Sequence, residues 1–587
     1  MTETDHTAPS PNASRTLQVA VVGAGPVGLS MALQLARSGV SVRILDRREG
    51  PSDQPRAHVV NARTMELFRE WGIADGVRAD GLSPELAASF GWVTTVGADE
   101  FGTVPYVDEQ TAERCSPERW CNCAQDLVEA RLLEAATAAG AVVDYGHEVV
   151  GYRASVLDGH EAGELDVRGP SGVETVRGRF VVAADGASSP MRRMAGVGRG
   201  HAGSLGRKLN IYFTADLTLD TRLRPNILWF VHNPRTQGIL ITLDGKQRWV
   251  YGVNLAEGES AQDYDTAKCE ALVRAAVGRE DLDVDVLNRS SWTLDMGVAE
   301  RFRVGPLLFA GDAAHRFPPT GGFGMNSGIQ DVHNLAWKLV HVLRGSADVS
   351  LVDTYEAERR PVAVVNVEQS MANAEGMYQA DALLNAPETL AALGAPEGAE
   401  LRAGIQQSLD LMRPHMHSLG QQFGHVYKGA AVVDDGSEER ESTIEEYRMT
   451  ARPGARAPHA RVDVADGSDQ GVSVVDIVNG QWTLLTAKTG DVWRVAAAPA
   501  SRSLGLKVIE VLPKPDRTHT GPEVVVDSAE PGYWQRLYEL EDGGAVLVRP
   551  DGHVLARWQR EPVDPPKAVE DALRSVLGVD VQMTARH

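Results

Sequence analysis

The segment LQVAVVGAGPVGLSMALQLARSGVSVRILDRR, residues 17–48, decides the fold of the first part of the chain. An apolar run, Leu17 to Val22, predicts a buried strand. A glycine-rich turn, a helical pattern and a second strand that ends at Asp46 follow it. A strand, a G-x-G-x-x-G turn, a helix, a strand and an acid in this order are typical of a dinucleotide-binding unit.

The residues of the turn have distinct expected tasks. Gly23 permits the tight turn, Gly25 lets a pyrophosphate approach the backbone, and Gly28 lets the helix pack closely on the strand. Pro26 opens the helix, whose N-terminus faces the anion. Asp46 is placed to accept hydrogen bonds from ribose hydroxyls. A glycine turn that merely tightens the unit would not explain this acid, but the motif leaves NAD and FAD open because both carry ADP.

A second stretch, FAGDAAHRFPPTGGFGMNSGIQDVHNLAWKL at residues 309–339, favours FAD. It predicts a buried strand, a loop rich in proline and glycine, and an apolar helix face closed by Gly345. The loop, residues 318–326 and called the flavin loop below, brings the backbone of its glycines, which carry no side chains, to a helix N-terminus. A flavin ring needs such a flat surface, with amide donors and a positive helix end. Asp312 is placed to hold the ribityl chain.

Composition limits the class of protein. The 587 residues carry a formal net charge of −22, which argues against a nucleic acid or an anionic membrane as the main partner. The first fifteen residues are polar and read as a disordered tail without a signal peptide, and we find no apolar run that spans a bilayer. Four cysteines without a secretion signal indicate a reducing cytoplasm and no disulfides.

Three segments, VVGAGPVGL, VVAADGASSPMRR and the stretch at 309–339, resemble the three FAD motifs of the single-component flavoprotein aromatic hydroxylases. This is the p-hydroxybenzoate hydroxylase and phenol hydroxylase superfamily. The segment ARPGARAPHARV and the chain length are closest to its 2-hydroxybiphenyl 3-monooxygenase and 2,4-dichlorophenol 6-monooxygenase branch.

Carried over by position, the resemblance implies a set of FAD-binding residues. They are Gly23, Gly25, Pro26, Gly28, Asp46 and Arg47 at the ADP half, Arg56 near the pyrophosphate, Gln125 and Asp312 at the ribityl and phosphate region, Asp185 for both FAD and NAD(P)H, and Pro319, Gly322, Gly324, Met325 and Asn326 at the ring. Ser188 replaces a frequent arginine or histidine, so the choice between NADH and NADPH stays open. No metal site is expected.

The resemblance implies a monooxygenase with one non-covalent FAD. NADH or NADPH reduces the flavin, O2 forms a C4a-hydroperoxide, and one oxygen is transferred to a phenolic or hydroxy-heteroaromatic ring. One alternative is Baeyer–Villiger oxygen insertion or epoxidation of a polyketide-derived substrate on the same fold. A flavin halogenase is a further alternative, whose W-x-W-x-I-P element is absent. A non-catalytic flavin-binding protein is the last.

Hydroxylation of a phenol requires a base, because the phenolate is far more reactive and the phenol has a pKa of about 10. His58 is the candidate, since the resembled biphenyl-type hydroxylases carry a histidine at the matching place. The alternative is that His58 only packs against the flavin or a loop carbonyl. His315 is the second candidate, although its place after Asp312 suggests support of the flavin loop.

We expect an α/β chain with three structured parts. Trp229, Trp249 and Tyr251 are interpreted as packing residues of the substrate sheet. The C-terminal part resembles a thioredoxin-like domain without C-x-x-C, for which a structural role in a homo-oligomer is expected. The expected ranges are 1–15 for the tail, 16–205 and 291–395 for a Rossmann-like FAD-binding domain with 80–115 on the substrate side, 206–290 for an antiparallel substrate-binding sheet, 396–440 for a helical linker and 441–587 for the thioredoxin-like domain.

Overall fold

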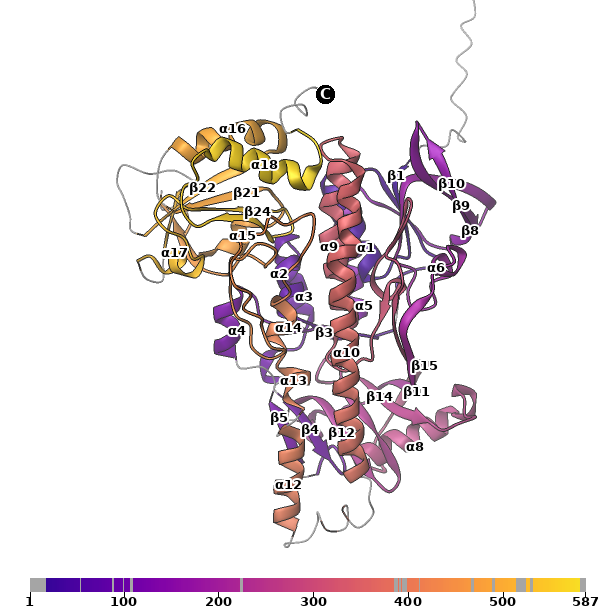
Figure 1. The fold of residues 1–587 in the computed structure, drawn as a ribbon. Helices are drawn as coiled ribbons and strands as arrows, with labels where there is room; N and C mark the ends of the chain where they lie inside the picture. Colours follow the sequence, from indigo (N-terminus) through magenta and orange to yellow (C-terminus); the bar gives the residue numbers. More distant parts are fainter. Residues whose placement is uncertain are drawn as a thin grey trace, which may run out of the picture.

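The computed structural model describes residues 17–580, apart from 53, 87–88, 99, 106–108, 222–224, 385–388, 390–391, 393–397, 411, 466–468, 488–490, 514–523 and 528–530. The predicted tail lies outside the described residues. Figure 1 shows two sheets beside a pair of long helices and a third sheet near the C-terminus. The α/β fold class predicted from the sequence is confirmed.

The first sheet is the dinucleotide-binding layer. Its strands run in the order β16-β17-β10-β1-β2-β7, and the neighbours from β17 to β7 are parallel. The central part of this sheet, residues 19–22, 44–45, 180–183 and 307–309, is apolar and buried, as a parallel sheet covered on both faces requires. The bounds are β1 Leu17–Val22, β2 Val42–Leu45, β7 Val142–Asp144, β10 Gly172–Ala183, β16 Arg303–Val304 and β17 Leu307–Phe309, with the hairpin β8 Glu148–Leu157 and β9 His160–Gly169 joined to β10.

Helices pack closely beside this sheet. Helix α1 packs against both α5 and α9. The bounds are α1 Pro26–Arg37, α2 Ala62–Glu70, α3 Ala74–Asp80, α5 Gln125–Ala138, α6 Pro190–Met194 and α9 Phe323–Leu343. Two short strands, β3 Val59–Val60 and β6 Cys121–Asn122, form a separate antiparallel pair between the two large sheets.

The second sheet has the order β18-β15-β11-β14-β13-β12-β4-β5. It extends beyond the predicted range at both ends, because β11 begins at Arg199 and β15 ends at Ala299. Its strands are β4 Ser89–Val93, β5 Glu100–Pro105, β11 Arg199–Thr214, β12 Asn226–Asn233, β13 Thr236–Thr242, β14 Arg248–Leu255, β15 Asp285–Ala299 and β18 His315–Arg316.

The two faces of this sheet differ. Helix α8 (Thr266–Val277) shares one core with Trp229, Trp249 and Tyr251, which are at most 2% exposed. These aromatics are therefore packing residues, as the sequence indicated. The other face carries a separate cluster that includes Trp92 and α12 (Ala399–Asp410), so α8 and α12 lie on opposite faces.

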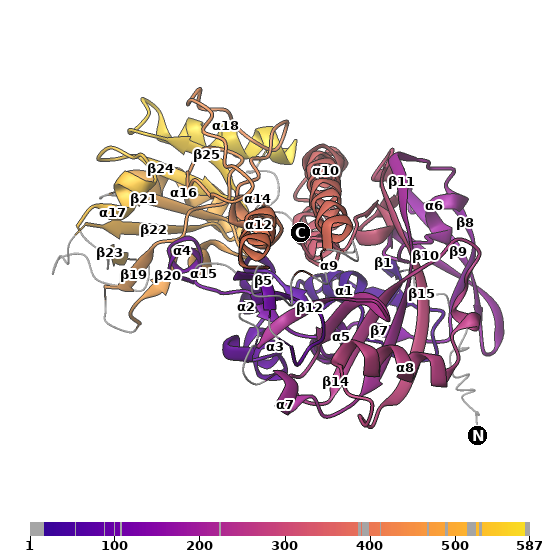
Figure 2. The same ribbon diagram turned by 90° about the horizontal axis from the view of Figure 1, so that it is seen from below.

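Helix α10 (Asp353–Leu384) joins the layers. In Figure 1 it runs beside α9 and continues down to the second sheet, and Figure 2 looks along it. The tyrosine hydroxyl of Tyr378, near its C-terminal end, donates to the carbonyl of Leu205 in β11 at 3.0 Å. The short helices α13 (Arg413–Met416) and α14 (Leu419–Phe423) follow α12.

The C-terminal domain is thioredoxin-like. Its sheet has the order β20-β19-β23-β22-β21-β24-β25. Its core is continuous with that of the first layer, since Trp482 meets Trp337 of α9 edge to face at 5.6 Å between ring centres. The elements are β19 Arg461–Val464, β20 Val472–Ser473, β21 Thr483–Ala487, β22 Lys507–Leu512, β23 Val524–Asp527, β24 Ala545–Val548, β25 Val554–Trp558, α15 Val474–Val478, α16 Asp491–Leu504, α17 Tyr533–Leu537 and α18 Pro565–Leu577.

Two general expectations can be compared with this fold. All four cysteines, Cys115, Cys121, Cys123 and Cys269, are buried free thiols. Within the described part of the chain, no helix is long and apolar enough to cross a membrane.

Candidate active site

The three glycines of the first turn have different surroundings. Gly23 has φ +105°, and a Cβ there would lie 2.3 Å from the carbonyl oxygen of Ala184. A Cβ on Gly28 would lie 1.9 Å from the carbonyl oxygen of Gly23. A Cβ on Gly25 would meet no described atom within 4 Å. Gly23 and Gly28 are thus required by chain packing, whereas Gly25 borders open space in which an anion fits.

Open space at Gly25 coincides with a helix N-terminus. Gly25 is the N-cap of α1, Pro26 is the first helical residue, and no described side chain caps this end. The first amide groups of a helix have no partner within it, and they carry the positive end of its dipole. The turn therefore offers N–H donors to a phosphate.

Asp46 directly follows β2 beside this turn, and Arg48 is already hydrogen-bonded to both oxygens of its carboxylate. One oxygen accepts from the Ala24 amide at 2.6 Å and from Arg48 Nη2 at 3.1 Å. The other accepts from the Arg48 amide at 2.8 Å and from its Nε at 3.2 Å. These bonds use the four acceptor positions of the carboxylate, so a ribose hydroxyl needs Arg48 to move. Arg47 is exposed, and its predicted role stays a prediction.

The segment after β2 is tied to the start of α5. The Gln125 amide donates to the carbonyl of Ala57 at 2.8 Å, and Gln125 Oε1 accepts from the Ala57 amide at 3.3 Å. Gln125 Nε2 donates to Glu129 at 2.8 Å. Arg56, the neighbour of Ala57, is exposed. Arg56 and Gln125 therefore lie in the same part of the fold, which two residues that bind one FAD molecule require.

Asp185 follows β10 and has one unused oxygen. Its Oδ2 accepts from the Met191 amide at 2.9 Å, whereas its buried Oδ1 has no partner among the described residues. Burial raises the pKa of this carboxyl group. A Cβ on the adjacent Gly186, at φ +78°, would meet no described atom within 4 Å. A hydroxyl or amide donor from a ligand would satisfy Asp185.

The second glycine-rich loop has the same construction as the first. Gly321 and Gly322 have φ +96° and +66°, and Gly322 is the N-cap of α9, to which no described side chain is bonded. Asp312 is exposed in the turn Gly311–Ala313, 3.9 Å from the place of a Cβ on Gly324. Of the other residues predicted to bind the flavin ring, Pro319 is exposed, Met325 is half-buried and Asn326 is buried.

Asn326 joins this loop to the His58 segment. Its Nδ2 donates to the carbonyls of Val59 at 2.9 Å and of Gly322 at 2.7 Å. Its Oδ1 accepts from the Asn61 amide at 3.0 Å. His58 is therefore one residue from a backbone group bonded to the flavin loop.

His58 is half-buried, and its ring is held on one side. Its Nδ1 lies 2.6 Å from Asn122 Oδ1. An amide oxygen only accepts, so Nδ1 carries the proton and Nε2 keeps its lone pair. Burial lowers the pKa of His58, partly offset by this hydrogen bond. The ring is thus neutral at pH 7 and can accept a proton.

His315, the second candidate base, has a different environment. It is fully buried, and its Nε2 lies 2.6 Å from Asp331 Oδ2, which also accepts from the Gly311 amide at 3.2 Å. Asp331 Oδ1 accepts from Arg359 Nε at 2.8 Å. This arrangement supports the turn that contains Asp312 and leaves His315 away from solvent.

Sequence reasoning missed Asp331, Arg359 and Arg48. Asp331 lies within the apolar helix pattern, and its partners are 16 and 28 residues away. The pair Arg47-Arg48 follows a strand end, where the sequence does not indicate which side chain turns inward. A buried acid in an apolar helix was the only available signal.

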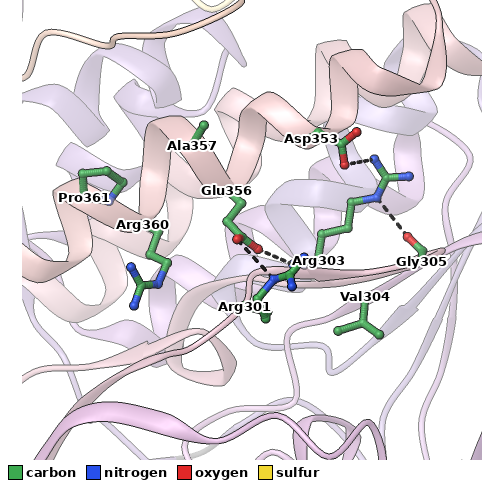
Figure 3. Close-up of a pocket in the computed structure, with 9 residues that line it drawn as sticks. All are labelled: Arg301, Arg303, Val304, Gly305, Asp353, Glu356, Ala357, Arg360 and Pro361. Atoms are coloured by element: carbon green, nitrogen blue, oxygen red, sulfur yellow. Dashed lines mark hydrogen bonds and ion pairs between the residues drawn. The ribbon is translucent and has the colours of Figure 1, made fainter.

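A hollow on another part of the surface is not this site. It lies between β16 and the start of α10, and none of its lining residues is a predicted site residue (Figure 3). Its charges largely pair with one another: Arg303 contacts Asp353 at 2.7 Å and Arg301 contacts Glu356 at 3.3 Å.

The residues present fit FAD. The chain offers two uncapped helix N-termini, open space at Gly25 and an unsatisfied oxygen on Asp185. These features lie at the carboxyl ends of β1, β10 and β17, where ligands of open parallel sheets bind. Uncapped amides match the anionic pyrophosphate and the electron-rich edge of the flavin ring.

Comparison with known proteins gives concordant results. Residues 16–370 match the FAD binding domain family, and residues 450–579 match the C-terminal domain of aromatic-ring hydroxylases. The chain is 33% identical to a 4-methyl-5-nitrocatechol 5-monooxygenase of Burkholderia sp, covering 95% of this chain and 97% of the relative. It is 32% identical to a putative polyketide hydroxylase of Streptomyces halstedii, covering 95% and 96%.

The solved structures agree. The crystal structure of the flavin-dependent monooxygenase PieE in complex with FAD and substrate has a TM-score of 0.86 and 29% identity, covering 97% of this chain and all of that one. FAD as cofactor and monooxygenase activity, both predicted from the sequence, are confirmed. The chain belongs to the family of FAD-dependent aromatic-ring hydroxylases.

Proposed function

We propose that this monooxygenase hydroxylates a phenolic or hydroxy-heteroaromatic ring and that His58 Nε2 accepts the proton of the ring hydroxyl. The observation that carries the proposal is the position of His58, which is fixed by Asn122 and lies one residue from the carbonyl that Asn326 binds. Bound FAD, reduced by NADH or NADPH, supplies one oxygen atom from O2 to the ring.

The chemistry needs a neutral base. A phenol with a pKa near 10 is largely protonated at neutral pH, and its phenolate is the electron-rich form that an electrophilic oxygen attacks. The lowered pKa of His58 keeps its imidazole neutral in the same pH range. Gly322 and Gly324 of the flavin loop have no side chains, so the backbone of the loop can lie directly against the flavin ring.

A polar cluster on the second sheet supports a substrate with several oxygen substituents. His232 Nε2 lies 3.4 Å from Asp381 Oδ1, and the ammonium group of Lys208 makes no hydrogen bond or ion pair with a described residue. Burial lowers the pKa of Lys208, partly offset by Asp381. Trp292, which pairs with Lys208 across β11 and β15, has a buried indole N–H without a described partner.

These donors lie on the face of the sheet opposite α8. Successive side chains of a strand point to opposite faces of the sheet. Leu209 and Ile211 of β11 lie in the core shared with α8, so Lys208 points to the opposite face. The path along α10 from Ser370, which accepts from Thr320 of the flavin loop, to Asp381 is about 16 Å at 1.5 Å per residue. A fused-ring phenol with carbonyl groups suits this length better than a single ring.

The test is His58→Gln with FAD still bound. We expect substrate-dependent hydroxylation to fall by about 10²-fold or more at pH 7 and to recover partly at high pH, where the phenol ionises without help. Phenols and fused-ring phenols are compared with NADH and with NADPH, and the product is identified by NMR to separate hydroxylation from ring-oxygen insertion. Unchanged coupled hydroxylation from pH 6 to 9 in His58→Gln would refute the base.

Self-association and a cytoplasmic location complete the proposal. The C-terminal domain presents exposed valines on α16, such as Val492 and Val495 at 40% and 64% exposure, which suit a subunit contact. Light scattering of the purified chain with Val495→Lys tests the contact, and fractionation of the producing cells tests the location. A small aromatic substrate and O2 are the expected partners.

A further inference from the structure

We propose that Asn122 is a positioning residue that fixes His58 in the Nδ1–H tautomer and presents Nε2 to the substrate hydroxyl. The inference rests on the proposed function only for its catalytic consequence. The tautomer itself is a property of the resting protein and can be measured without turnover.

The backbone holds the two residues close together, at the end of one antiparallel strand pair. The strands β3 and β6 pair Val59 with Asn122, and the Cys123 amide donates to the His58 carbonyl at 2.8 Å. The Leu82 amide also donates to the Asn122 carbonyl at 2.8 Å. Asn122 is 1% exposed, so its amide has little freedom to turn away from the imidazole. The 2.6 Å contact of Nδ1 with Oδ1 is thus built into the sheet pairing.

The orientation of the amide has a chemical consequence. With Oδ1 toward His58, the buried Nδ2 of Asn122 has no partner among the described residues. The reverse orientation would donate to Nδ1 and place the histidine proton on Nε2, where it could not act as a base. The two arrangements therefore predict opposite tautomers, which makes the inference testable.

An amide suits this place better than a carboxylate. Both accept the Nδ1–H, but a carboxylate would stabilise the imidazolium and raise the pKa of His58 above the working range. The amide orients the ring without adding charge. His58 can then release the proton it has taken, which a tightly paired imidazolium would retain.

The other groups packed against the His58 segment are neutral or already paired. Burial raises the pKa of Cys121 to about 11 and raises that of Cys123 further, so both thiols are uncharged. At the start of α5, Asp126 contacts Arg248 at 2.6 Å and Glu129 contacts Arg48 at 3.3 Å. On α9 the neighbour is the amide of Asn326, and on the segment itself Arg56 is exposed.

The first measurement is the tautomer. Long-range ¹H–¹⁵N spectra of the FAD-loaded protein with ¹⁵N-labelled histidine are recorded, and His58→Gln identifies the His58 signals. We expect the Nδ1–H form at neutral pH and a pKa below 6.5. An Nε2–H form would overturn the inference, and this result needs no Asn122 variant to fold.

The second measurement compares Asn122→Asp with Asn122→Leu. The aspartate keeps an acceptor oxygen and adds a charge, so we expect the pKa of His58 to rise by about 1–3 units and the acid limb of the kcat profile to move by the same amount. Activity should approach that of the wild type at pH 9. Asn122→Leu lacks the acceptor, so kcat should fall about tenfold or more at every pH, with KM changed less.

A control and a contrast separate the possible results. Gln470→Glu adds a negative charge at an exposed position of the C-terminal domain and should leave the His58 signals and the pH profile unchanged. If Asn122→Asp raises the pKa of His58 but not the kinetic pKa, the positioning role stands and His58 is not the base. An unchanged His58 pKa in Asn122→Asp contradicts the positioning role itself.

Discussion

Asn326 Nδ2 donates to the carbonyl of Val59 at 2.9 Å, and this bond joins the loop that precedes α9 to the strand that follows His58. The same side chain accepts from the Asn61 amide at 3.0 Å. Two segments that are about 265 residues apart in sequence are thus held by one amide. The relation between the flavin loop and the proposed base depends on it.

Asn326→Ala should uncouple this monooxygenase. The change leaves buried backbone groups of Val59 and Asn61 unpaired, at about 1–3 kcal/mol for each group. We expect a lower melting temperature and more H2O2 per NAD(P)H consumed, because His58 and the flavin loop can separate. Gln330→Ala, one turn later on α9, is the control. Unchanged coupling in a folded, FAD-loaded Asn326→Ala would contradict the role of this bond.

Asp331→Asn should destabilise the protein strongly at neutral pH. Arg359 is 2% exposed, and removal of its anionic partner leaves a buried guanidinium without compensation, at about 3–5 kcal/mol. Urea unfolding followed by intrinsic fluorescence measures the loss. Asp75→Asn, whose side chain is 97% exposed, serves as the control and should change stability very little.

The contribution of Asp331 should depend on pH in a definite direction. His315 and Arg359 hold the pKa of Asp331 below its usual range, despite burial that acts in the opposite sense. A lowered folded-state pKa gives stability that is complete above the unfolded pKa of about 3.9 and is lost as pH falls through the folded value. The difference in unfolding free energy between wild type and Asp331→Asn should therefore be constant from pH 8 to 5 and shrink below about pH 4.

Two partners in the buried ion cluster between α10 and the C-terminal domain should differ in importance. Glu358 accepts from Lys338 at 2.7 Å and from Arg549 at 2.5 and 3.0 Å. Burial lowers the pKa of Lys338 to about 8, although Glu358 raises it, and the positive charge of Arg549 lowers it further. Lys338→Met keeps the Glu358–Arg549 pair, whereas Glu358→Gln leaves two buried cations, Lys338 and Arg549, that share Asp551 as their remaining buried anion among the described residues.

We therefore expect Glu358→Gln to lower the free energy of unfolding by about 3–5 kcal/mol and Lys338→Met to lower it by clearly less. Chemical unfolding at pH 7 with FAD in excess gives both values. An equal loss in the two variants would mean that Lys338, rather than Arg549, is the main partner of Glu358.

Lys208→Met should change substrate choice rather than chemistry. Lys208 interacts electrostatically with Asp381, which lies about 16 Å along α10 from Ser370, the residue that the flavin loop contacts. A small phenol at the flavin loop would not extend that far. We expect KM for a fused-ring phenol with carbonyl groups to rise about tenfold, with kcat and the kinetics of a simple phenol unchanged. Lys246→Met, in the exposed turn before β14, is the control. Equal effects on both substrates would exclude the proposed contact.

The sequence predicted those parts of the site in which a motif acts through neighbouring residues. The turn at residues 23–28 and the loop at 318–326 place glycines at positions where local geometry requires them, so they were recognisable without a structure. The partner of His58 was not, because Asn122 is 64 residues away and reaches it only through the pairing of β3 with β6. The contact of Arg48 with Asp46 was missed for a local reason. Two adjacent arginines follow the strand, and the sequence does not show which of them binds the carboxylate.

Substitutions of Gly25 and Gly28 should separate FAD binding from folding. A Cβ on Gly28 would lie 1.9 Å from the carbonyl oxygen of Gly23, so Gly28→Ala should fail to fold or lose several kcal/mol of stability through overpacking. Gly25 has φ −79°, which alanine and valine adopt without strain, and a Cβ there enters open space. Gly25→Val should therefore fold with the circular dichroism of the wild type. Its side chain would occupy the space of the pyrophosphate, so we expect colourless protein whose affinity for added FAD, measured by quenching of flavin fluorescence, is at least about 100-fold weaker. Gly25→Val that purifies with a full complement of FAD would show that the cofactor does not pass this turn.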